Sequence, residues 1–166
     1  MANYNSEMLR GIPMNFEPKR PNRFFAEFPT DMGIEVWTIQ KFKRPSLKIN
    51  PIEIKYMNSS NFVIGNYVWN TMEITFLDLI GPSVSQKVME WVRLHAESIS
   101  GREGYAAGYK KDIVLRQLDP GGAPIDKWTL EQCMITDVAF GENDHDSDAV
   151  QTITLTIQPW RCIHNI

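Results

Sequence analysis

The sequence lacks the features that mark several common classes of protein. Its 166 residues carry a formal net charge of −3, so they hold no surplus of the cations with which a sequence-independent DNA binder neutralises phosphates. No apolar run approaches the roughly 20 residues of a membrane-spanning helix, and the N-terminus lacks the basic and then apolar pattern of a signal peptide. We therefore expect a protein that is made and folded in the cytosol, with neither a membrane nor specifically bound DNA among its partners.

Signals for catalysis and for a bound cofactor are equally scarce. The sequence contains neither a Gly-x-Ser-x-Gly turn nor a catalytic-cysteine signature, and its three histidines lack a metal-ligand spacing. Cys133 and Cys162 lie far apart in strand-like tracts of a chain without a secretion signal, which favours two buried thiols over a disulfide. We expect no enzyme activity and no cofactor.

Three aspartates, Asp144, Asp146 and Asp148, have the spacing of the first ligands in a calcium-binding loop. The central glycine of that loop is absent, and Leu155 occupies the position of its closing glutamate. These differences favour a solvated turn, so we predict no metal site.

The composition, with 43% apolar and 22% charged residues, is that of an ordinary globular protein. Residues 21–166 are enough to form one domain with a core. Residues 1–20 have no sustained period, and Pro13 and Pro18 oppose both a helix and a central strand. We predict an N-terminal arm there, either a disordered tail or a segment that orders only against a neighbour.

Most of the domain has the period-2 alternation of β-strands. The Asp-Pro-Gly-Gly turn at 119–122 predicts a hairpin between the strands on its two sides, and the loop at 29–33 suits a second hairpin. The predicted strands are residues 22–28, 34–42, 47–57, 67–78, 111–118, 125–135 and 150–160. The sequence therefore predicts a mainly β fold.

One helix is expected, over about residues 83–99. Ser83 and Gln86 form a capping box at its start. The apolar stripe of this helix carries Val84, Val88, Trp91 and Val92 and continues to His95 and Ile99. Charged side chains occupy the opposite face, so the helix should lie on a sheet as a lid, with one face in water.

The strand at 67–78 and the tract at 47–61 are expected to have distinct roles. In the strand, the apolar face carries Val68, Met72, Ile74 and Phe76, and the opposite face carries Thr71, Glu73 and Thr75. Pro51 cannot donate to a strand ladder, which excludes the tract at 47–61 from the centre of a sheet. We predict that this tract is a hairpin that projects from the body, with its turn at residues 58–61.

Four segments in this order make the sequence similar to the tail tube proteins of contractile-tailed bacteriophages. They are Arg20-Pro21-Asn22-Arg23-Phe24, Gly65-Asn66-Tyr67-Val68-Trp69, Tyr109-Lys110-Lys111-Asp112-Ile113-Val114 and Val150-Gln151-Thr152-Ile153-Thr154-Leu155. Together they span residues 20–160, with the helix between the second and the third.

The resemblance implies two packed antiparallel sheets, as a sandwich or small barrel, with one flanking helix. It also implies hexameric rings that stack into a tube, through which DNA leaves the virion when a surrounding sheath contracts. The implied partners are other copies of the chain, the tail sheath protein, baseplate and tail terminator proteins, and a tape measure protein in the lumen. The implied location is the virion tail, assembled in the host cytoplasm.

In such a tube we expect Ile49, Ile52, Ile54 and Tyr56 to make the contact between stacked rings. The lumen should be lined by Thr71, Glu73 and Thr75, because fixed cations there would hold the DNA. Two other functions stay open within the family, a baseplate tube initiator and the tube of a related contractile injection system. A monomeric β-sandwich that binds a ligand through its tryptophans and acidic loop is the alternative from another class.

Overall fold

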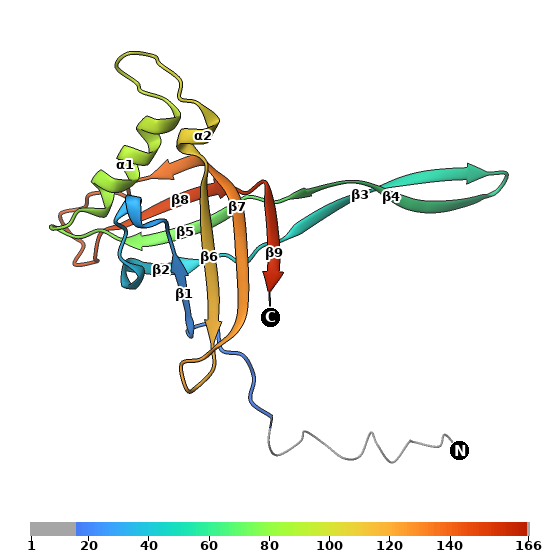
Figure 1. Ribbon diagram of the computed structural model, residues 1–166, viewed down its shortest axis with the longest axis horizontal. Coiled ribbons are helices and arrows are strands. Elements are labelled where there is room, and N and C mark those ends of the chain that lie inside the picture. The colour runs from blue at the N-terminus through green and yellow to red at the C-terminus, as the bar shows by residue number, and fades with distance from the viewer. Residues whose placement is uncertain (1–15, 166) are drawn as a thin grey trace.

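The computed structural model describes residues 16–165, which form a β-domain from which one long hairpin projects (Figure 1). The strands are β1 (Phe24–Glu27), β2 (Ile39–Phe42), β3 (Leu47–Tyr56), β4 (Ser59–Trp69), β5 (Met72–Leu77), β6 (Lys111–Leu118), β7 (Pro124–Ala139), β8 (Thr152–Gln158) and β9 (Arg161–Asn165). The helices are α1 (Val84–His95) and α2 (Ala106–Tyr109), with 3-10 turns η1 (Thr30–Met32) and η2 (Val36–Thr38). The predicted arm at 1–20 lies mostly outside the described residues.

The strands of the body pair antiparallel in the order β1-β6-β7-β8-β5-β2, and β9 also pairs with β7. Strand β7 belongs to two sheets, because its first part pairs with β6 and β9 and its last residues pair with β8. Between these parts Gln132 has a positive φ of 51°, and the register shifts between Ile135 and Asp137. The bent strand β7 thus belongs to both sheets, and the two sheets pack on each other. This arrangement confirms the predicted fold class.

The core lies between the sheets and under α1. Alternation places one face of β5 and one face of β8 in it, where cross-strand neighbours such as Met72 and Ile157 are fully buried. The other buried side chains of these strands are Ile74, Phe76, Ile153 and Leu155. Polar side chains of the same strands face outward.

Helix α1 begins as predicted and ends earlier. The Ser83 hydroxyl accepts a hydrogen bond from the Gln86 backbone N–H at 3.4 Å, as an N-cap does. The chain turns extended at Ala96, and the Gly101 N–H bonds the Glu97 carbonyl in the turn that follows. Ile99 is thus outside the helix and 93% exposed. Its predicted place on the apolar stripe is wrong.

The predicted hairpin of 22–28 with 34–42 is also wrong. Strand β1 pairs with β6, and β2 pairs with β5, so the two lie on different sheets. The 3-10 turns η1 and η2 in the connection carry the chain from one sheet to the other. Strand β1 still contacts η2 and β2, which brings the two ends of the strand order together.

The strand predicted at 67–78 is two strands in the structure. It breaks at Asn70 and Thr71, where the Asn70 N–H bonds the Ser46 carbonyl at 2.9 Å. Tyr67 and Val68 consequently belong to the hairpin, and Val68 is 54% exposed rather than in the core. The last strand, β9, lies beyond the strands predicted from the sequence.

Candidate functional site: assembly surfaces

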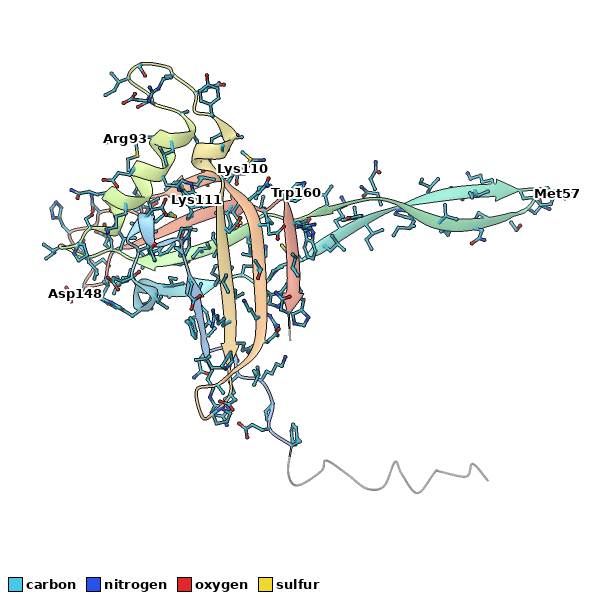
Figure 2. All side chains as sticks on the ribbon, viewed as in Figure 1. Met57, Arg93, Lys110, Lys111, Asp148 and Trp160 are labelled. Carbon is cyan, nitrogen blue, oxygen red and sulfur yellow. The ribbon has the colours of Figure 1, made fainter. Side chains whose placement is uncertain are left out.

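The projecting hairpin of β3 and β4 is longer than the sequence predicted. Its turn is Met57-Asn58, and β4 returns as far as Trp69, so the hairpin spans 47–69 rather than 47–61. Every residue of β3 is exposed. Figure 2 shows Met57 at the tip and side chains along the whole ribbon that no other element of the described chain covers.

Apolar side chains occupy both faces of this hairpin. Ile52 pairs with Val63 and shares its face with Ile54 and Tyr56, two and four residues on. The opposite face carries the pairs Ile49–Tyr67 and Pro51–Ile64, together with Phe62. The four residues predicted to make the contact between rings are therefore not one patch, because Ile49 lies on the other face of the ribbon.

A bulge in the middle of the hairpin requires Gly65. The register shifts between Ile49 and Pro51, and a Cβ at Gly65 would lie 2.4 Å from the Asn50 carbonyl oxygen. Any other residue would therefore push the two strands apart there. The resemblance segment at 65–69 thus begins at a position where the backbone itself demands glycine.

An isolated two-stranded hairpin is marginally stable in water. Here Ile52, Ile54, Ile64 and Tyr67 are each 53–71% exposed. Exposed apolar surface on this scale usually marks a binding site. We infer that the hairpin is an assembly surface, and that both of its faces become covered.

The three residues predicted to line a lumen lie near one another but not on one strand. Thr71 lies in the turn before β5, while Glu73 and Thr75 are on the outward face of β5. The register places Thr156 beside Glu73 and Asp137 beside Thr156, which makes one polar row across three strands. Asp137 was missed because only the strand pairing, and no local pattern, brings it beside Glu73.

The residues of the helix stripe hold α1 against the body. Val84, Val88 and Trp91 are buried, and Val92 is partly buried. The Trp91 indole N–H donates to the Tyr109 carbonyl at 2.6 Å. This bond ties α1 to α2.

His95, at the end of α1, is a packed histidine. Its Nε2 accepts a hydrogen bond from the Ile135 N–H at 3.0 Å, and its ring stacks on Tyr109. Burial lowers the pKa of His95, although a hydrogen bond with the Trp91 carbonyl opposes this effect. The neutral ring thus serves as a structural link between helix and sheet.

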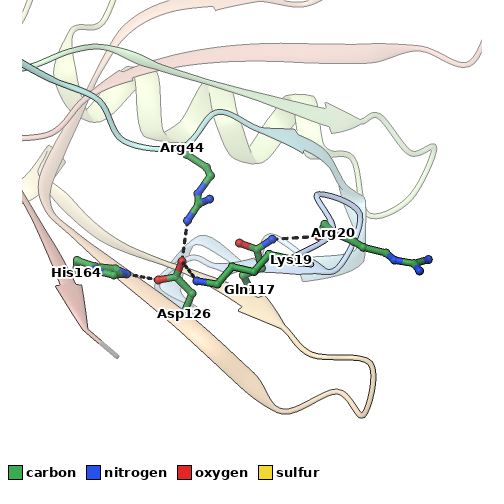
Figure 3. A network of polar contacts seen from close by, with 6 residues as sticks. All are labelled: Lys19, Arg20, Arg44, Gln117, Asp126 and His164. Atoms are coloured by element: carbon green, nitrogen blue, oxygen red, sulfur yellow. Dashed lines mark hydrogen bonds and ion pairs between the residues drawn. The ribbon is translucent and has the colours of Figure 1, made fainter. Parts of the chain in front are cut away.

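A buried carboxylate on β7, Asp126, connects three distant parts of the chain. It accepts bonds from Lys19 at 3.2 Å and Arg44 at 2.7 Å, and it contacts His164 on β9 (Figure 3). Burial alone would raise the pKa of Asp126, but hydrogen bonds from His164 and Lys19 outweigh it and lower the pKa. Asp126 thereby fixes the N-terminal segment and the root of the hairpin to the body.

No constellation for chemistry emerges from residues 16–165. Burial raises the pKa of Cys162 to about 12 and that of Cys133 further, so these free thiols are poor nucleophiles. In the same residues no group of three or more His, Cys, Asp and Glu side chains is placed to hold a metal ion. Of the helices described, none has the length and apolar character to span a membrane.

No protein-family model and no curated protein matches this chain. The fold, by contrast, has close counterparts among solved structures. A chain in the structure of the PVC sheath/tube terminator, from an extracellular contractile injection system, has a TM-score of 0.73 at 15% identity, over 92% of this chain and 99% of that one.

Two further structures agree. A chain in the structure of the tube-terminating cap of the anti-feeding prophage has a TM-score of 0.73 at 14% identity, over 95% of this chain and 96% of that one. A chain of the PVC sheath-tube complex has a TM-score of 0.72 at 13% identity, over 99% of both chains. The protein thus has the fold of tube components of contractile injection systems, as the resemblance in sequence implied.

Proposed function

We propose that this protein is a structural subunit of the inner tail tube of a contractile-tailed bacteriophage. Copies join in hexameric rings, the rings stack, and the tube conducts DNA when the sheath contracts. The role is mechanical and requires no catalysis. The observation that carries the proposal is the uncovered hairpin, apolar on both faces, on a body with the fold of tube proteins.

The hairpin supplies the contact between subunits. A contact between the tip of one subunit and the body of another is head-to-tail, and such a contact must close into a ring or propagate as a filament. Ile52, Ile54 and Tyr56 form one contact face, and Ile49 contributes to the other. Each hairpin thus touches two neighbouring molecules, one on each side.

The outward face of β5, β8 and β7 lines the lumen in this proposal. Glu73 and Asp137 lie in one row on it, with threonine between them. Repetition around a ring would make a belt of carboxylates that repels the phosphates of passing DNA. Thr71 and Thr75 complete this polar lining.

The other partners in this proposal are the sheath, baseplate and terminator proteins, with a tape measure protein inside the tube until DNA passes. Chains solved in a sheath-tube complex, a terminating cap and a baseplate support this set, because they have the same fold. The assembled protein would lie in the tail of the virion, after assembly in the host cytoplasm.

A baseplate tube initiator is the second candidate. A chain of the anti-feeding prophage baseplate has a TM-score of 0.68 at 13% identity, over 90% of this chain and 97% of that one. The tube of a related contractile injection system would have the same fold and would carry a cargo other than phage DNA.

Assembly of the purified protein tests the proposal. Negative-stain microscopy and light scattering should show rings or tubes that form as the concentration rises. An initiator would stop at single rings, whereas a tube protein would form stacks. A 19.1 kDa monomer that persists at high concentration would contradict both and favour a monomeric binding module.

A further inference from the structure

The body contains a second apolar surface, a pocket between its two sheets. It has a volume of about 380 Å³ and opens between the end of β2 and the strands β1, β6 and β7. Its apolar walls come from Phe24, Phe42, Leu115 and Trp128, and Asp126 lies at its edge. Figure 3 shows Arg44, which also lines the pocket, bonded directly to Asp126.

Two N–H groups beside this pocket have no acceptor. Within residues 16–165, Arg116 Nε and Trp128 Nε1 are buried and find no hydrogen-bond partner, although both side chains line the pocket. A buried donor without an acceptor is unfavourable. The pocket therefore suits an occupant that combines an apolar body with an oxygen acceptor. A small shift of the Arg116 or Trp128 side chain would bring its N–H to that acceptor.

We propose that this pocket receives the tip of the hairpin, Tyr56 and Met57, from a second copy of the chain. This inference rests on the proposed function and names the surface that the hairpin binds. Tyr56 and Met57 are 71% and 86% exposed. A tyrosine supplies both an aromatic ring for the apolar walls and a hydroxyl oxygen that accepts from Arg116 or Trp128.

The hairpin carries its tip away from the pocket of its own molecule. Arg44 lines the pocket, and β3 begins three residues later at Leu47, so pocket and tip lie at the two ends of one ribbon. Ten residues of β3 span about 33 Å at a rise of about 3.3 Å per residue. The tip points away from its own barrel (Figure 1), so it can enter only the pocket of another molecule.

This arrangement is head-to-tail. Each subunit offers one tip and one pocket, so the contact repeats from copy to copy and can close into a ring or continue between rings.

Cysteine crosslinking between two populations tests this proposal. A Met57→Cys variant and a Gln40→Cys variant, mixed before assembly and oxidised, should give a covalent dimer, because Gln40 lies on the exposed rim of the pocket. Ile80→Cys and Tyr105→Cys, at two other highly exposed apolar positions, replace Met57→Cys in the controls and should give none. Dimers with a control in place of Met57→Cys would overturn the proposal in favour of another loop.

A blocked pocket provides the second test. Gln40→Trp should fill the pocket from its rim and raise the concentration needed for assembly at least tenfold, with unchanged thermal unfolding of the monomer. The matched control is Lys43→Trp, on the same segment but outside the pocket lining, which should assemble normally. Tyr56→Phe, which loses only the hydroxyl, should fall between the native protein and Tyr56→Ala.

The outcomes separate the two proposals. Rings or tubes that form without the crosslink between positions 57 and 40, or with Gln40→Trp as well as with the native chain, would overturn this inference and leave the proposed function intact. A native chain that never assembles would overturn both.

Discussion

The body and the hairpin use the same local pattern with opposite results. In β5 and β8, alternating apolar residues are fully buried between two sheets, as Ile74 and Leu155 are. In β3 and β4, Ile52 and Ile64 alternate in the same way and remain 55% and 71% exposed. Alternation therefore specifies a strand and its two faces, but not whether the covering surface comes from the same molecule.

The difference implies that the two regions contribute to different free energies. Side chains of the body stabilise the folded monomer, whereas in the proposed assembly those of the hairpin contribute once another chain covers them. Mutations in the two regions should therefore separate cleanly into effects on unfolding and effects on assembly.

Removal of the hairpin should have the largest effect on assembly. Ile49 and Tyr67 are cross-strand partners, so replacing residues 50–66 with Asn-Gly closes the ribbon with a favourable two-residue turn. The shortened protein should fold, with a free energy of unfolding within about 1 kcal/mol of the native value, because the core includes none of the deleted residues. Analytical ultracentrifugation should show only monomers.

Variants of single faces sharpen this test. Ile52→Thr with Ile54→Thr alters one face, and Phe62→Thr with Ile64→Thr alters the other. Each pair should weaken assembly, because the proposed assembly covers both faces. Normal polymerisation of the shortened protein would exclude the hairpin from the contacts between subunits.

In the body, Trp91→Ala should have the largest effect on stability. Trp91 is 2% exposed and bonds the Tyr109 carbonyl, so its removal leaves a cavity and an unpaired acceptor. Denaturant unfolding should show a loss of about 3–5 kcal/mol. Leu94→Ala on the same helix, at a side chain that is 46% exposed, is the matched control and should cost far less. A loss below about 1 kcal/mol for Trp91→Ala would mean that α1 is not a lid on the core.

Local signals in the sequence were sufficient for much of the fold. The Ser83 cap located the start of α1, and the turn at 119–122 located the hairpin of β6 and β7. Alternation also located the strand at 150–160, which contains β8 with Ile153 and Leu155 buried. These features depend on residues a few positions apart, which is the range over which sequence patterns carry information.

Long-range pairing was not predictable in the same way. Phe24 pairs with Gln117, and no local pattern brings β1 to β6 rather than to β2. The hairpin was predicted too short because Asn58-Ser59-Ser60-Asn61 reads as a turn, whereas Ser59 already begins β4. Asp126 went unnoticed because its partners Lys19, Arg44 and His164 lie 107, 82 and 38 positions away in the chain.

Asp126→Asn should have an intermediate effect on stability. The carboxylate is 2% exposed, while Lys19, Arg44 and His164 are about half exposed. Water can therefore hydrate these three side chains when Asp126 is replaced by a neutral residue. We expect a loss of about 1.5–3 kcal/mol at neutral pH, the range for hydrogen bonds to a charged group. Asp148→Asn, at an exposed loop position, should change stability by less than about 0.5 kcal/mol.

The pH dependence of this loss of stability follows from the direction in which the pKa of Asp126 shifts on folding. Because the folded state lowers the pKa of Asp126, its contribution is complete above the unfolded pKa of about 3.9 and is lost as the pH falls through the folded value. The difference between native protein and variant should therefore be constant at neutral pH and shrink in acid. A difference that grew in acid would contradict the ion-pair assignment.

Glu73→Lys should have the smallest effect on the molecule and test the lumen assignment. Glu73 is exposed on β5 beside Thr156, so the substitution should change the free energy of unfolding by less than about 0.5 kcal/mol and leave assembly intact. In a closed ring, Glu73→Lys would replace a belt of carboxylates, which repels phosphate, with a belt of ammonium groups, which binds it. Release of DNA should slow at low salt and recover at higher salt, because screening at physiological ionic strength limits such forces to about 8–10 Å. Glu73→Gln, which removes the charge without reversing it, should slow release less. Normal release by Glu73→Lys at low salt would mean that this face of β5 does not line the channel.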